Sequence, residues 1–164
     1  MNKLIVSLVL GIAFAGGGAA QAQSPAPQTP QAQRAAPNDV DPNSMLNAAL
    51  QVAQLIDAGR SGEIWDGSSE IAKRTVNRDA FVKQIATGRA AFGQPVSRVW
   101  ASVIRQVVTA PQAGQAPPAG SPPPGAYITV RFATRFSGGQ SVGELVSFRL
   151  DENGTWRVAG YTIQ

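Results

Sequence analysis

The chain has 164 residues and a net charge of +4, and it contains no cysteine and no histidine. These absences exclude disulfides, thiol and imidazole nucleophile systems, and most zinc, copper and non-haem iron sites. The ten acidic residues show no calcium-loop spacing, so we expect no metal and no other cofactor.

The first 22 residues have the pattern of an export signal. Lys3 precedes an apolar run at 4–15, and Ala20-Gln21-Ala22 offers a small-x-small cleavage site. The apolar run is shorter than the roughly 20 residues that span a bilayer. We therefore predict cleavage after Ala22, a periplasmic or secreted location, and no transmembrane segment once the signal is removed.

Two segments follow the signal. Residues 23–42 are mostly Pro, Ala, Gln and Ser, a composition typical of a disordered linker. Residues 43–164 have the length of a single domain with its own core.

Three helices are predicted in the first part of this domain. The first begins with Ser44 as N-cap and ends at Gly59, and its apolar residues recur with helical spacing. The second covers 62–73, where Gly67 is a weak point. The third begins at Asn77 and ends before 93–95.

The apolar period then changes to that of strands. Strands are predicted at 98–108, 127–136, 142–150 and 156–163, and the first carries apolar residues on both faces. Six prolines mark 110–125 as a long loop. Residues 151–154 predict a hairpin, built on either a type I turn with a glycine bulge or a type I′ turn. Helices followed by strands indicate an α+β fold with N-terminal helices packed on a four-stranded antiparallel sheet.

Several short motifs resemble one known family. They are Leu55-Ile56-Asp57-x-Gly59, Ile64-Trp65, Phe92-Gly93, Ser97-Arg98, Glu144, and Gly154-x-Trp156-Arg157-Val158-Ala159-Gly160-Tyr161. With the aromatic strand at 127–136, they resemble the bacterial exported domain of unknown function 4019 across the folded domain. This resemblance implies a bent sheet wrapped around the helices, as in nuclear-transport-factor-2-like or cystatin-like cones. It supplies no catalytic residues.

Glu144 is the first candidate for chemistry, because its position between Val142 and Val146 places it on the core face of a strand. An unpaired buried carboxylate has a raised pKa and can act as a general base. An arginine partner, or a place at a solvated sheet edge, would instead make Glu144 structural.

Asp57, Asp66 and Trp65 form a second candidate near the turn between the first two helices. In cone-shaped relatives this region borders a cavity mouth, so the acids and the aromatic ring could bind or protonate a ligand. Capping of a helix or a loop is the alternative role for either aspartate.

A third candidate is a basic, aromatic patch on one face of the sheet. Strand alternation predicts that its members project together if the last hairpin has the type I and bulge form: Arg131, Arg135, Arg149, Arg157, Tyr127 and Tyr161. Arginines suit phosphate or carboxylate groups on a ligand or partner. A solvated outer face would show the same pattern.

These observations favour a non-enzymatic domain that binds an envelope protein or an anionic small ligand, and not a nucleic acid. One alternative is a small lyase, isomerase or hydrolase that uses Glu144 or Asp57 as a base. Another is an envelope structural or assembly factor, which a large exposed apolar patch would favour.

Overall fold

The computed structural model describes residues 40–164. The predicted signal at 1–22 and the linker up to residue 39 lie outside the described residues. In the described part, the helices precede the strands: α1 (Pro42–Asp57), α2 (Ser61–Asp66), α3 (Glu70–Thr75) and α4 (Arg78–Arg89), then β1 (Pro95–Val108), β2 (Gly125–Phe136), β3 (Ser141–Leu150) and β4 (Trp156–Ile163).

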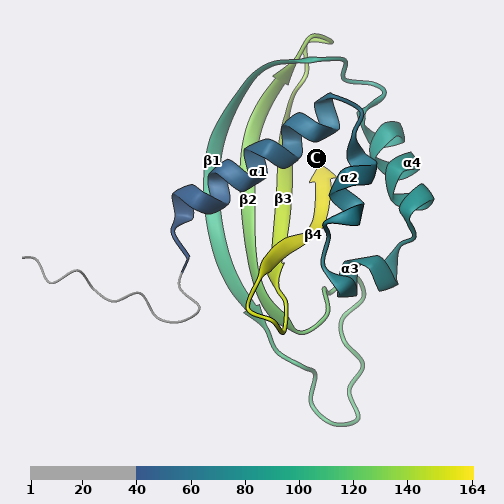
Figure 1. The fold of residues 1–164 in the computed structure, drawn as a ribbon, viewed down its shortest axis with the longest axis vertical. Helices are drawn as coiled ribbons and strands as arrows, with labels where there is room; N and C mark the ends of the chain where they lie inside the picture. The colour runs from purple at the N-terminus through teal and green to yellow at the C-terminus, as the bar shows by residue number, and fades with distance from the viewer. Residues whose placement is uncertain (1–39) are drawn as a thin grey trace, which may run out of the picture. The chain divides into compact units, whose positions relative to one another are not determined.

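The strands form one open antiparallel sheet in the order β1-β2-β3-β4. Each strand pairs with its neighbour in sequence, so β1 and β4 are the two edges. Figure 1 shows α1 lying across the sheet, with α2, α3 and α4 gathered on the β4 side. The predicted α+β class, with N-terminal helices and a four-stranded antiparallel sheet, is confirmed.

The core lies between the helices and one face of the sheet. On β2, Ile128, Val130 and Phe132 are buried, whereas the alternate residues Arg131 and Arg135 are exposed. This alternation follows from the two-residue period of a strand, in which successive side chains point to opposite faces. The buried side chains meet apolar residues of α1, α2 and α4 in a single cluster.

The first helix begins earlier than predicted. Its N-cap is Asp41, which accepts a hydrogen bond from the Asn43 backbone, and Pro42 occupies the first turn. The prediction of Ser44 as N-cap was wrong because proline, with its fixed φ, is favoured at the first helical position. Gly59 ends the helix with a φ of 71°, as predicted.

The single helix predicted at 62–73 is wrong, because the structure has two short helices, α2 and α3. The Ser68 hydroxyl donates to the Ile64 carbonyl at 2.7 Å, and the Ser69 side chain caps α3 through the Ala72 amide. Gly67 lies at the break, where its low helix propensity lets these serines end one helix and begin the next.

Turns and strand ends follow the predictions closely. The last hairpin has a hydrogen bond from the Gly154 amide to the Asp151 carbonyl at 2.9 Å, and Gly154 has a φ of 77°. This geometry fits the type I turn with a glycine bulge. β1 is longer than predicted and begins at Pro95.

The proline-rich loop is attached to the sheet at its C-terminal end. The Tyr127 hydroxyl donates to the Pro123 carbonyl at 2.7 Å, and Arg149 donates to the Pro124 carbonyl at 3.4 Å. These contacts cover Tyr127 and Arg149, which are both buried.

Candidate functional site

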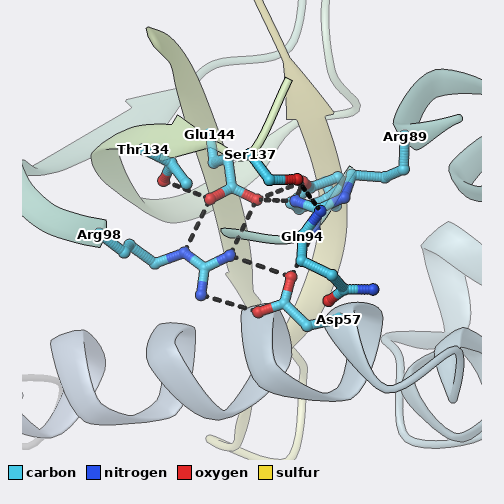
Figure 2. A network of polar contacts seen from close by, with 8 residues as sticks. Asp57, Arg89, Gln94, Arg98, Thr134, Ser137 and Glu144 are labelled. Carbon is cyan, nitrogen blue, oxygen red and sulfur yellow. Dashed lines mark hydrogen bonds and ion pairs between the residues drawn. The ribbon is translucent and has the colours of Figure 1, made fainter. Parts of the chain in front are cut away.

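Glu144 lies at the centre of a buried network of charged and polar groups (Figure 2). Its side chain is 0% exposed, on the helix-facing side of β3. Six side chains make up this network, one from each of α1, α4 and the four strands: Asp57, Arg89, Arg98, Thr134, Glu144 and Tyr161.

Four groups donate to the Glu144 carboxylate. Arg89 Nη1 lies 2.6 Å from Oε1, and Arg98 Nε lies 2.7 Å from Oε2. The Tyr161 hydroxyl donates to Oε1 at 2.6 Å, and the Thr134 hydroxyl donates to Oε2. Both carboxylate oxygens are therefore saturated, as a buried charge requires.

Asp57 completes the network from the last turn of α1. Arg89 Nη2 lies 2.5 Å from its Oδ1, and Arg98 Nη1 lies 2.9 Å from its Oδ2. Each arginine thus bridges the same two carboxylates, and the four charges cancel. Asp57 and Arg89 also line a surface depression of about 250 Å³ together with Gly93 and Gln94, so this end of the network reaches the surface.

The network keeps Glu144 ionised. Burial alone would raise the pKa of Glu144, but hydrogen bonds from Arg98, Thr134 and Tyr161 outweigh burial and hold its pKa below the ordinary value. Burial and the neighbouring Glu144 carboxylate raise the pKa of Tyr161, so the phenol stays protonated. Although burial opposes the charge on Arg98, its hydrogen bonds to Asp57 and Glu144 raise its pKa.

A general base needs the opposite environment, namely a raised pKa and a free lone pair facing a pocket. Glu144 has neither, since four donors occupy its oxygens. Asp57 is likewise held by both arginines. Of the two roles that the sequence left open for Glu144, the structure shows the arginine-paired one, and the network joins α1 and α4 to all four strands.

Asp66 and Trp65 lie outside this network. Asp66 is exposed and pairs with Arg78 at 3.0 Å. The Trp65 indole donates to the Val76 carbonyl at 3.0 Å, and Lys73 lies 5.6 Å from the centre of its ring. Trp65 therefore joins α2 to the end of α3, and Asp57 and Asp66 have different partners.

The predicted basic patch is only partly assembled. Strand register places Tyr127, Arg149 and Arg157 in one row, on the same face as the exposed Arg131 and Arg135. The arginines thus share a face, as predicted.

Burial and ion pairs reduce the accessible part of this patch. Arg149 lies under the end of the proline-rich loop and pairs with Asp151 at 3.1 Å and Glu152 at 3.3 Å. Arg157 approaches the same Asp151 at 3.6 Å. Placing Tyr161 on this face was wrong, because it pairs with Val146 and directs its hydroxyl to Glu144 on the opposite face.

Arg89, Arg98 and Thr134 are the network residues that sequence reasoning missed. Arg98 interrupts an apolar strand, and this signal parallels the one that singled out Glu144. Arg89 lies in the last turn of a helix, where a basic residue is favoured by the helix dipole alone. Nothing in the local sequence distinguishes it from an ordinary surface arginine.

A second feature of the structure is the exposed edge strand β1. All the large hydrophobic residues that are exposed in the described part of the chain lie on β1. Each is 55–68% exposed: Val96, Val99, Trp100, Ile104 and Val107. At the other edge, α3 and α4 pack beside β4 and the Ser69 amide donates to the Val158 carbonyl at 2.9 Å, whereas the helix that packs on β1 is α1, which lies across one face of the sheet. Long apolar edge strands are normally shielded, because their free amides and carbonyls can pair with another chain.

Two features are absent from residues 40–164. No helix there is long and apolar enough to cross a bilayer. No group of three or more acidic side chains is arranged to hold a metal ion in that part of the chain.

Comparison with known proteins assigns the family. The model of the family described as "Protein of unknown function (DUF4019)" matches residues 48–161, which include every member of the buried network and all of β1. No curated protein matches the chain. The matched segment covers most of the chain, and the protein therefore belongs to the DUF4019 family.

Proposed function

We propose that the protein is an exported, non-enzymatic domain that binds an extended apolar segment of a protein along the edge of β1. The single observation that carries this proposal is the set of five exposed hydrophobic side chains on β1, whose outer edge pairs with no strand within residues 40–164. Strand addition uses the free backbone groups of such an edge for affinity, and the flanking side chains select the added segment.

The buried network supports a binding role over a catalytic one. The alternative enzyme would need Glu144 or Asp57 as a base, yet both carboxylates are ion-paired with Arg89 and Arg98. An interaction role also agrees with the expectation that an exposed apolar patch favours an assembly factor.

Export is the part of the proposal that rests on the sequence alone, through the signal pattern at 1–22. Its test is the intact mass of the protein recovered from the periplasmic fraction of an expressing bacterium. We expect a chain that starts at Gln23. Full-length chain found only in the cytoplasmic fraction would contradict export.

Binding along β1 is tested by a photo-crosslinking amino acid placed at Val99 in living cells. We expect light-dependent protein adducts, because Val99 is exposed beside the free edge. The matched control is the same probe at Thr162, an exposed residue on the other edge strand. Adduct formation at Val99 should be lost when Ile104→Lys is added. The absence of adducts at Val99, or equal adducts at Thr162, would contradict the proposal.

A further inference from the structure

The free edge of β1 is apolar on both faces of the sheet. Val99 and Ile104 pair with Ala133 and Thr129, so they lie on the face turned away from the helices. Trp100 pairs with the buried Phe132 and lies on the helix-facing side. A strand added beside β1 would thus meet apolar neighbours above and below, and polar side chains on either face would be a poor match.

The exposed apolar surface is large enough to matter for association. The five exposed side chains leave on the order of 500 Å² of apolar area open, against the roughly 800 Å² that each partner buries in a stable interface. The backbone edge of a 14-residue strand adds further area and hydrogen bonds. One strand pairing along this edge therefore approaches the size of a specific dimer interface.

The side chains of β1 make the strand itself a suitable partner for the edge of a second copy. It contains no acidic residue and no lysine, and it carries large apolar side chains on both faces. The strand has two charged residues: Arg98, which is neutralised inside the same subunit by Asp57 and Glu144, and Arg105, which is exposed to solvent. Two copies of β1 can accordingly pair without burying an uncompensated charge at Arg98.

We propose that the partner of this edge is a second copy of the chain, bound by antiparallel pairing of β1 with β1 about a two-fold axis. The inference rests on the proposed function, since it names the segment that the edge binds. The axis passes near Ser102, the residue that follows the β-bulge in β1. This placement brings Val99 beside Ile104 of the partner subunit and joins the two sheets into one continuous sheet.

The first test is sedimentation equilibrium of the purified protein over a wide concentration range. We expect a monomer–dimer equilibrium for the wild type. The double variant Val99→Lys/Ile104→Lys should raise the dissociation constant by on the order of 100-fold, because like charges would face each other across the axis. Circular dichroism and thermal unfolding confirm that the variant still folds, as expected for two exposed positions. Thr162→Lys, on the other edge, is the control and should dimerise like the wild type.

The second test uses the absence of cysteine in the chain. A Ser102→Cys variant has a single thiol near the proposed axis, and mild oxidation with diamide should link two copies by a disulfide. The Thr162→Cys variant should stay monomeric under the same conditions. A dimer that survives the double lysine substitution, or that fails to cross-link through Ser102→Cys, would overturn pairing along β1.

The outcomes separate this inference from the proposed function. A protein that is monomeric at every concentration, yet forms photo-adducts at Val99 with other proteins, would overturn the second-copy inference and leave strand addition in place. A monomer with no adducts would overturn both. Adducts of twice the subunit mass, with a concentration-dependent dimer, would support both.

Discussion

Arg98 on β1 and Glu144 on β3 are joined across the intervening strand β2 by a hydrogen bond of 2.7 Å between Nε and Oε2. Thr134 of β2 pairs with Arg98 in the ladder and donates its hydroxyl to the same carboxylate. The contact therefore connects three strands on the helix-facing side of the sheet. Through Asp57 it also reaches the end of α1.

Substitution Arg98→Met should destabilise the protein strongly. It removes two hydrogen bonds from a fully buried carboxylate and leaves Glu144 partly uncompensated, which typically costs about 3–5 kcal/mol. Urea unfolding measures the change in the free energy of unfolding. Arg78→Met, which breaks an exposed ion pair with Asp66, is the matched control and should have little effect. Similar losses in both variants would contradict a special role for the buried network.

Stability should fall in acid because of Glu144. The pKa of Glu144 is lower in the folded protein than in the unfolded chain, so its stabilisation is complete above the ordinary value of about 4.3. That stabilisation is lost as the pH falls through the lowered pKa.

Urea unfolding at a series of pH values tests this dependence. The decline in acid should be shallower in Glu144→Gln than in the wild type. Glu63→Gln, at an exposed ion pair, should retain most of the wild-type slope. Identical slopes in the wild type and in Glu144→Gln would contradict the prediction.

Both tyrosines of the chain should ionise at a higher pH than a free phenol. Burial raises the pKa of Tyr127 and, together with Glu144, that of Tyr161. Their contribution to stability is present below the ordinary phenol pKa of about 10 and is lost as the pH rises through the raised values. Ultraviolet titration should show phenolate only at higher pH in the folded protein than in urea. Tyr161→Phe isolates the signal of Tyr127, and a titration unchanged by urea would contradict the burial of these phenols.

Tyr127→Phe should loosen the proline-rich loop. The variant loses the hydrogen bond from the phenol to the Pro123 carbonyl, which is worth about 1 kcal/mol. Limited proteolysis should then cut within residues 110–125 faster than in the wild type. Ser137→Ala, which loses the hydrogen bond from the Gln94 amide beyond the opposite end of β2, serves as the control. Equal cleavage rates would show that this hydrogen bond does not restrain the loop.

The sequence predicted the sheet well because strand order follows chain order. The apolar alternation at 127–136 and 142–150 and the turn residues at 151–154 are local signals, and they placed β2, β3 and β4 within two residues of their observed ends. The helices were harder, because Pro42 and the serines beside Gly67 act through capping contacts that compete with apolar periodicity.

The sequence allowed only part of the buried network to be predicted. Glu144 was recognisable because a charged residue stood on an apolar face, but its partners come from positions 46 and 55 residues away in the chain. Local patterns carry no information about such contacts. The exposed edge gave one signal, since the apolar residues of the first strand fell on both faces. The sequence alone did not show that no other strand of residues 40–164 pairs with the outer edge of β1.

The two edge strands of the sheet have different surroundings, and this difference limits how many subunits can join through their sheets. The helices α3 and α4 pack beside β4, and the Ser69 amide donates to that strand, whereas α1 lies across the helix-facing side of β1 and no strand within residues 40–164 pairs with its outer edge. Because each subunit has one free edge strand, pairing of two subunits leaves neither with a free edge. Assembly by this route stops at a pair, and a fibre would require the helices beside β4 to detach first.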